Sequence, residues 1–142
     1  EILEEYFMIA NQHVHVLDEF NNFMEEEIYQ MMVATTEDQD ELILENTTTL
    51  KVARWWNRAC DIIPCNGGKD IGIQKILDYF NFNKEEAMAF GDGGNDISML
   101  KYVGTGVAMG NAKDDVKAIA DYITDSVQED GIVSALKHFE IL

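Results

Sequence analysis

Proline and cysteine are scarce in this chain of 142 residues, which contains one proline and two cysteines. With so little proline and 46% hydrophobic residues, the chain is expected to fold as a globular protein rather than stay disordered. Cys60 and Cys65 lack the Cys-x-x-Cys spacing of a metal site. Two such cysteines favour a reduced, cytoplasmic setting over a disulfide scaffold.

Basic residues are also few, with 10 Lys and Arg against 27 Asp and Glu and a net charge of −17. A field of this sign repels nucleic acids and anionic membranes, so neither is expected as a partner. No apolar run approaches the roughly 18 residues of a membrane span, and no signal peptide is recognised. The first residue is Glu1 rather than methionine, so the natural start is expected upstream, unless processing or tag removal produced this end.

The most informative stretch covers residues 87–100 and reads AMAFGDGGNDISML. Its apolar beginning, up to Phe90, predicts a buried parallel strand. The spacing of Ile97 and Leu100 predicts the start of a helix. Three glycines lie between them, and they favour a loop that adopts positive φ and lets a ligand approach the backbone.

That loop holds two carboxylates, Asp92 and Asp96, and one amide, Asn95. A carboxylate at the carboxyl end of a strand, facing a helix N-terminus, is well placed to hold a hard cation and a phosphate together. Taken alone, a Gly-Asp-Gly sequence more often marks an ordinary turn, and a lysine after two glycines, such as Lys69, is more often a solvated turn residue.

The sequence GDGGND at 91–96 closely resembles the fourth motif of haloacid dehalogenase superfamily phosphatases, in the form found in Cof-type sugar-phosphate phosphatases. The resemblance continues upstream at Lys69, in the place of the third-motif lysine. Downstream it includes GTGVAMGNA at 104–112, ADYIT at 120–124 and EDGI at 129–132. Several motifs in family order are far more specific than one, and the resemblance extends from about residue 29 to residue 142.

The resemblance implies an α/β fold, with a Rossmann-like parallel sheet core and part of a smaller α/β cap domain. Residues 1–65 would form the carboxyl-terminal part of the cap, and residues 66–142 the carboxyl-terminal half of the core. Independently, strand and helix patterns alternate after residue 69, which predicts a parallel sheet covered by helices. The expected strands lie at 28–36, 58–64, 87–91, 105–109 and 122–124, and the expected helices begin near 37 and 97 or cover 71–80, 114–120 and 132–139.

The resemblance also implies a chemistry. In this family Mg²⁺ and a lysine gather negative charge around a phosphoryl group while an aspartate attacks it, and water then hydrolyses the aspartyl-phosphate. Asp92 matches the metal ligand, and Asp96 matches a second acid that reaches the metal through water or orients the lysine. Asn95 matches the amide that binds the substrate phosphate. Lys69 matches the lysine that neutralises the negative charge as it shifts between nucleophile and phosphate. Residues 106–111 are expected to support the site.

The family's opening Asp-x-Asp-Gly motif, which carries the nucleophile, has no match in this sequence. Asp38-Gln-Asp40 lacks the glycine and lies too close to Lys69 to enclose a cap, so we expect it on the cap surface. The second-motif serine or threonine is also missing, and Thr35 and Thr36 fit a strand end better. We therefore expect a carboxyl-terminal portion that is nearly inactive alone, with unpaired sheet edges that favour self-association.

Two further groups have open interpretations. Arg54, Trp55, Trp56 and Arg58 resemble cap residues that contact a sugar phosphate, although packing of the tryptophans in the cap core is the favoured reading. His13 and His15 would share one face of a strand, a metal-like arrangement without a third ligand, so partly exposed strand histidines are the default reading.

The leading function is a Mg²⁺-dependent phosphomonoester hydrolase that acts on sugar or other small metabolite phosphates. The alternative is a non-catalytic phosphate- or metal-binding α/β module, or a fragment that assembles with a separate amino-terminal half. A phosphomutase of the same superfamily is a third option. The substrate itself is not readable, because half of the cap, where specificity would lie, is absent from the sequence.

Overall fold

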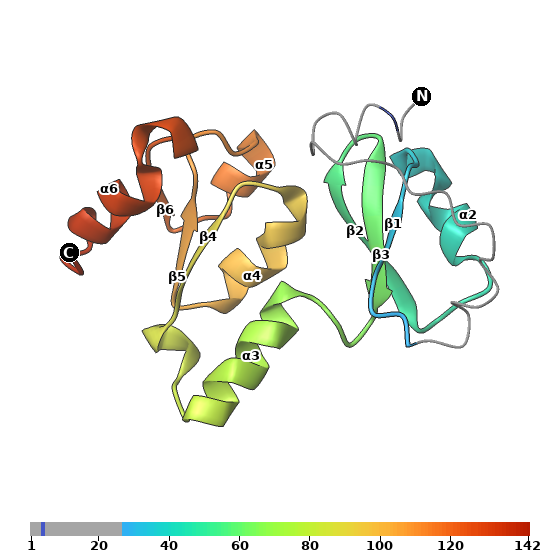
Figure 1. Ribbon diagram of the computed structural model, residues 1–142, viewed down its shortest axis with the longest axis horizontal. Helices are drawn as coiled ribbons and strands as arrows, with labels where there is room; N and C mark the ends of the chain where they lie inside the picture. The colour runs from blue at the N-terminus through green and yellow to red at the C-terminus, as the bar shows by residue number, and fades with distance from the viewer. Residues whose placement is uncertain (1–3, 5–26) are drawn as a thin grey trace.

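The computed structural model describes residue 4 and residues 27–142. Its described part contains two three-stranded sheets, and the segment 65–68 connects the first sheet to the helix that begins at Lys69 (Figure 1). The first sheet is antiparallel with the order β1-β3-β2, and the second is parallel with the order β4-β5-β6. The strand and helix alternation read from the sequence is thus confirmed as a parallel α/β sheet. His13 and His15 lie outside the described residues.

The first sheet is small and carries its helical segment on one face. Its elements are β1 (Met31–Val33), η2 (Glu37–Gln39), α2 (Asp40–Leu44), β2 (Leu50–Trp56) and β3 (Ala59–Pro64). Cys60 and Ile62 of β3 are buried, as expected for the central strand. In Figure 1, α2 lies on the side of this sheet that is turned away from the second sheet.

The strand expected at 28–36 is shorter than predicted, because β1 pairs with β3 over three residues only. After β1 the chain turns into η2, and the buried Thr35 marks this turn. The Thr35 hydroxyl donates to Gln39 Oε1 at 2.8 Å. The Thr35 backbone N–H donates to the carbonyl of Arg58 at 3.0 Å. β2 is a full strand of seven residues to which the sequence analysis assigns no element.

The second sheet is surrounded by helices, and its element order agrees with the predicted alternation. Its elements are α3 (Lys69–Phe80), η3 (Lys84–Glu86), β4 (Met88–Gly91), η4 (Gly94–Asp96), α4 (Ile97–Tyr102), β5 (Thr105–Ala108), α5 (Asp114–Lys117), β6 (Tyr122–Ile123), η5 (Val127–Glu129) and α6 (Gly131–His138). The helix expected at 71–80 begins two residues earlier, at Lys69, and this brings that lysine onto the helix.

The core of this part forms between the sheet and its helices. Leu100 of α4, Val107 of β5 and Val116 of α5 are almost fully buried. Burying side chains of this size stabilises the fold by about 1.5–3 kcal/mol each, which fixes the helices on the sheet. The loops at the carboxyl ends of β4 and β5 are therefore held in place by a packed core.

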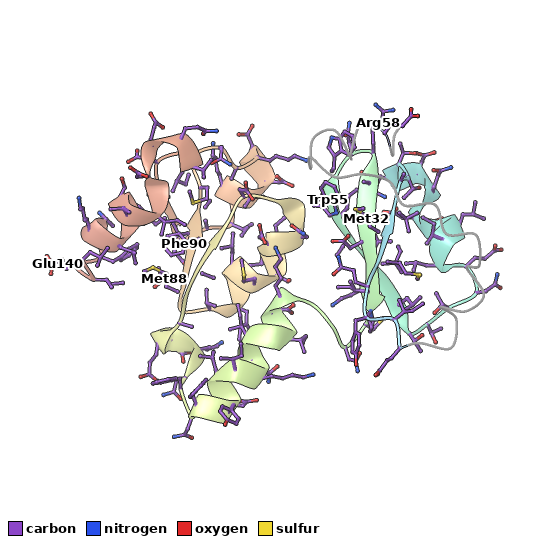
Figure 2. All side chains as sticks on the ribbon, viewed as in Figure 1. Met32, Trp55, Arg58, Met88, Phe90 and Glu140 are labelled. Carbon is purple, nitrogen blue, oxygen red and sulfur yellow. The ribbon has the colours of Figure 1, made fainter. Side chains whose placement is uncertain are left out.

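β4, an edge strand among the described strands, and α3 form one margin of this part (Figure 1). β4 pairs with β5, and no other described strand pairs with β4. On α3, the large apolar residues Ile76, Tyr79 and Phe80 are exposed by 60%, 82% and 61%. Figure 2 shows the side chains of α3 projecting outward along the lower border of the molecule. Self-association through this margin stays a prediction.

Within the described residues, none of the helices combines the length and apolar character that crossing a membrane requires.

Candidate active site

The loop after β4 folds tightly around Asp96. A Cβ atom on Gly91 would lie 2.6 Å from the Cβ of Asp96, so only glycine leaves space for this side chain. The expectation of positive φ in this loop is wrong. Among the described glycines only Gly68 adopts positive φ, and Gly93 has a φ of −107°. Close approach of other groups is thus the reason for these glycines. Asp96 is 5% exposed.

Asp96 is held by three donors. Its Oδ1 accepts a charge-assisted hydrogen bond from Nζ of Lys69, the first residue of α3. Its Oδ2 accepts from the backbone N–H of Asp92 at 3.0 Å and of Gly93 at 3.1 Å. Burial alone would raise the pKa of Asp96, but these bonds outweigh it, so the pKa lies below its ordinary value. Asp96 is therefore held as a carboxylate, and one of its oxygens accepts from Lys69.

Asp92 is oriented by a residue that the sequence analysis assigns only to supporting structure. Asn111, just after β5, donates from Nδ2 to Asp92 Oδ2 at 2.9 Å. Its Oδ1 accepts from the backbone N–H of Val127 at 3.0 Å, which defines the orientation of the amide. The signal in the sequence was its position after the neighbouring parallel strand, because the carboxyl ends of parallel strands meet at one sheet edge.

These groups surround one pocket of about 480 Å³. It is lined by Trp55, Lys69, Asp92, Gly93, Asn95, Asp96, Asn111 and Lys113. The structure thus brings together the four residues singled out in the sequence, and it adds Asn111 and Lys113. Trp55 reaches the pocket from β2 of the first sheet, while the other residues come from the second part of the chain.

The donor set fits a magnesium ion with few protein ligands. Asp92 uses Oδ2 for Asn111, which leaves its Oδ1 available as a ligand. Asp96 has both oxygens engaged, so a water-mediated contact suits it better than direct ligation. Among the described residues, no group of three or more His, Cys, Asp or Glu side chains forms a metal site. Mg²⁺ commonly uses one or two carboxylates and keeps several waters or substrate oxygens, so this set is compatible with it.

The four residues expected in the cap take different places. The Arg54 guanidinium forms an ion pair with Asp40 of α2, so a contact of Arg54 with substrate stays a prediction. Asp40 is thereby engaged with Arg54, and Asp38 is exposed on η2. Trp56 packs beside Arg58, whose guanidinium carbon lies 5.8 Å from the ring centre. Figure 2 shows Trp55 on the side of the first sheet that faces the second sheet.

The fold and the pocket define a class of α/β proteins with a Rossmann-like parallel sheet, whose loops at the carboxyl ends of the strands gather carboxylates, an amide and a lysine. The sequence matches the family model for haloacid dehalogenase-like hydrolases over residues 3–136. The chain therefore belongs to the haloacid dehalogenase-like hydrolase family.

Individual relatives agree with this assignment. The Bacillus subtilis protein YkrA is 40% identical over 116 residues, which are 82% of this chain and 45% of YkrA. The 5-amino-6-(5-phospho-D-ribitylamino)uracil phosphatase YitU of Bacillus subtilis is 44% identical over 89 residues, 61% of this chain and 33% of YitU.

A solved structure, of a sugar phosphatase of HAD subclass IIB, superposes with a TM-score of 0.87 at 40% identity. The match covers 98% of this chain and 54% of that one. The resemblance to Cof-type phosphatases and the Rossmann-like core with part of a cap are thus confirmed. The chain spans about half the length of YkrA and of this solved sugar phosphatase, and it corresponds to the carboxyl-terminal portion of its homologues.

Proposed function

We propose that this chain supplies the magnesium- and phosphate-binding half of a phosphomonoester hydrolase acting on sugar or other small metabolite phosphates. The observation that carries the proposal is the cluster of Lys69, Asp96 and Asp92 around one pocket. A lysine ammonium held by one carboxylate, in a pocket that a second carboxylate also lines, can bind a phosphoryl group while the pocket holds a divalent cation. The phosphatases among the relatives support this reading.

Each residue has a proposed task. Asp92 holds Mg²⁺, and Asp96 orients Lys69 and contacts the hydrated metal through water. The bound metal would supply charge neutralisation at the phosphoryl oxygens. Asn95 donates from its amide to the substrate phosphate, and the Lys69 ammonium compensates the negative charge that shifts during transfer. Lys113, on the same pocket, adds a second positive charge in a strongly acidic protein.

The nucleophile is proposed to come from outside this sequence. Asp92 and Asp96 are the carboxylate residues that line the pocket, and both are committed to other contacts. Asp38 and Asp40 lie on η2 and α2, which face away from the second sheet (Figure 1). We therefore propose that residues 1–65 belong to the cap and 66–142 to the core, and that this chain alone does not form an aspartyl-phosphate. We also propose a cytoplasmic setting, which the two free cysteines, Cys60 and Cys65, support.

Binding and hydrolysis test different parts of this function. Calorimetric titration of the chain with inorganic phosphate in the presence of Mg²⁺ is expected to show binding that Asp92→Asn abolishes. Asp38→Asn is the matched control, since it removes an exposed carboxylate of η2 and should leave binding unchanged. Phosphate binding that does not depend on Asp92 would contradict the proposed metal ligand.

Hydrolysis of p-nitrophenyl phosphate is expected to be absent with this chain. Hydrolysis that depends on Mg²⁺ and disappears in Asp92→Ala would show a complete catalyst, and the proposal of an external nucleophile would then be wrong. The Asp92→Ala variant also serves as the control for a contaminating phosphatase.

A second candidate is a non-catalytic phosphate- or metal-binding module, or a fragment that assembles with a separate amino-terminal half. It is favoured by the position of β4 at the edge of the described parallel strands and by the exposed aromatic residues of α3. It predicts phosphate binding without turnover even after upstream sequence with an Asp-x-Asp-Gly motif is restored. Turnover after that restoration would favour the hydrolase.

A further inference from the structure

We infer that Arg54, locked by Asp40, is a positioning residue that sets the Trp55 ring as a specificity-determining surface for the non-phosphoryl part of the substrate. The inference rests on the proposed function, because it concerns the same pocket. Trp55 lines the pocket formed with Lys69 and Asp92. It also lines a second, adjoining hollow of about 280 Å³ with Met32 and Asp61 of the first sheet.

Trp55 lies at a β-bulge, where the pairing of β2 with β3 shifts register. In the pairing of β2 with β3, Arg54 lies opposite Cys60 and Trp56 lies opposite Ala59, so the register shifts at Trp55. A bulge bends its strand and changes the direction of the extra side chain, and bulges commonly occur next to binding sites. Such an irregularity persists only where surrounding contacts stabilise it.

The Arg54 side chain supplies these contacts. Its Nη1 donates to the backbone carbonyls of Thr35 at 2.9 Å, of Trp56 at 3.2 Å and of Ala59 at 3.4 Å. These carbonyls follow β1, end β2 and begin β3, respectively. One guanidinium nitrogen therefore ties the three strands together at the position of the bulge. Trp56 and Ala59, the residue pair next to the bulge, therefore both accept from the same nitrogen of Arg54.

Asp40 fixes the other side of the guanidinium. Its Oδ1 and Oδ2 accept from Nη2 and Nε of Arg54, the latter at 3.4 Å. The pair is partly shielded, with side chains exposed by 17% and 24%. A planar fork that binds a carboxylate on one edge and carbonyls on another is specific to arginine, and a lysine ammonium cannot reproduce it. α2, which carries Asp40, thus contacts the sheet on the face opposite to Trp55.

The backbone of the bulge also touches the candidate active-site loop. A Cβ atom on Gly94 would lie 2.7 Å from the carbonyl oxygen of Arg54, so this carbonyl packs directly on the loop that carries Asn95 and Asp96. A shift of the bulge consequently displaces Trp55 relative to the phosphate-binding groups. Flat apolar ring faces, such as those of sugars or nucleobases, are the ligand surfaces that an indole ring at this place would contact.

The test compares two probes of the same pocket. Glucose 6-phosphate and inorganic phosphate are each titrated with Mg²⁺ into the 142-residue chain by calorimetry. Trp55→Ala is expected to weaken the binding of glucose 6-phosphate roughly three- to tenfold and to change the binding of phosphate less than about twofold. Arg54→Lys is expected to reproduce this selective loss. The double variant should bind no worse than Trp55→Ala alone, because Arg54 acts through Trp55.

A spectroscopic readout needs no ligand. The chain has two tryptophans, so Trp56→Phe leaves Trp55 as the only one. In that background Arg54→Lys and the isosteric Asp40→Asn should both change the acrylamide quenching and the anisotropy of Trp55. Arg58→Lys is the matched control and should change neither. The two conservative variants keep the test valid if Arg54→Ala fails to fold.

The outcomes separate the two proposals. If phosphate binds and Arg54→Lys weakens both probes equally, or leaves Trp55 fluorescence unchanged, the positioning role of Arg54 is wrong while the proposed function stands. The same holds if the double variant loses affinity additively, or if Trp55→Ala leaves the ratio of the two affinities unchanged. If neither probe binds the wild-type chain, both proposals fail.

Discussion

Lys69 and Asp96 form an ion pair that joins the first residue of α3 to the last residue of η4. The Lys69 side chain is 49% exposed and the Asp96 side chain 7% exposed, so the two partners contribute differently to stability. Loss of the buried carboxylate leaves two backbone N–H groups and an ammonium without their acceptor. Loss of the lysine leaves a carboxylate that still accepts two hydrogen bonds.

We therefore expect Asp96→Ala to lower the free energy of unfolding by about 3 kcal/mol, and Lys69→Met by only about 1 kcal/mol. Urea unfolding followed by circular dichroism measures both values. Ser98→Ala, which removes a weaker 3.2 Å hydrogen bond to Asp70 between α4 and α3, serves as a control with an expected loss below about 1 kcal/mol. Equal losses for Asp96→Ala and Lys69→Met would contradict the asymmetry.

Acid should weaken the fold through Asp96. Its pKa in the folded chain lies below the unfolded value of about 3.9, so the folded state binds this proton less readily than the unfolded state. The stabilisation is therefore complete above the unfolded pKa, and it is lost as the pH falls through the lower, folded pKa. The test measures urea midpoints of the wild type and of Asp96→Asn from pH 6.5 down to pH 3. The two midpoints should differ most at pH 6.5 and converge in acid. A difference that stays constant over this pH range would contradict the assignment to Asp96.

Much of the second sheet was predictable from the sequence, and the first was less so. The strand at 88–91 and the helix from 97 follow from a local change of hydrophobic period, which needs no distant partner. β1 was predicted too long, because its end depends on Thr35 contacting Arg58 and Gln39, which are distant or unpatterned in sequence. β2 was not assigned, since its seven residues are all half-buried and show no alternation.

The candidate site was likewise only partly predictable from the sequence. Lys69, Asp92, Asn95 and Asp96 could be proposed because they lie in motifs whose order resembles a family, and the structure places them on one pocket. The ion pair of Arg54 could not be predicted from the sequence, since a guanidinium suits a phosphate and an internal carboxylate equally well, and only the fold places Asp40 beside it. Asn111 was undervalued because its partners, Asp92 and Val127, lie 19 and 16 positions away in sequence.

Gly94 should control the contact between the first sheet and the active-site loop. Gly94→Ala places a Cβ atom 2.7 Å from a backbone oxygen of Arg54, which must move away. We expect faster amide hydrogen exchange in β2 and at residues 92–96, and weaker binding of glucose 6-phosphate with Mg²⁺. Gly72→Ala is the matched control, because a Cβ atom there meets nothing within 4 Å in α3, and it should stabilise the chain by about 0.5–1 kcal/mol. Unchanged exchange in Gly94→Ala would show that this contact does not hold the two parts together.

Asn111 should determine metal affinity without contacting the metal. Its amide holds Asp92 Oδ2 at 2.9 Å while its own oxygen is fixed by the Val127 N–H at 3.0 Å. Residues that orient a metal ligand typically change affinity 10- to 100-fold when lost, so Asn111→Ala is expected to weaken Mn²⁺ binding by roughly tenfold. Electron paramagnetic resonance of free Mn²⁺, used in place of Mg²⁺, measures this without any turnover. Asn57→Ala, at the exposed turn between β2 and β3, is the control and should bind Mn²⁺ like the wild type.

Asn111→Asp separates orientation from charge at the same position. A second carboxylate facing Asp92 disfavours ionisation of the pair, so in the absence of metal at least one of the two should keep its proton to a higher pH. Mn²⁺ affinity should then rise more steeply between pH 5 and pH 7 than in the wild type, because the metal competes with that proton. If Asn111→Ala and Asn111→Asp both bind Mn²⁺ as the wild type does across this range, Asn111 does not orient Asp92, and the link from η5 through Asn111 to this proposed metal ligand must be abandoned.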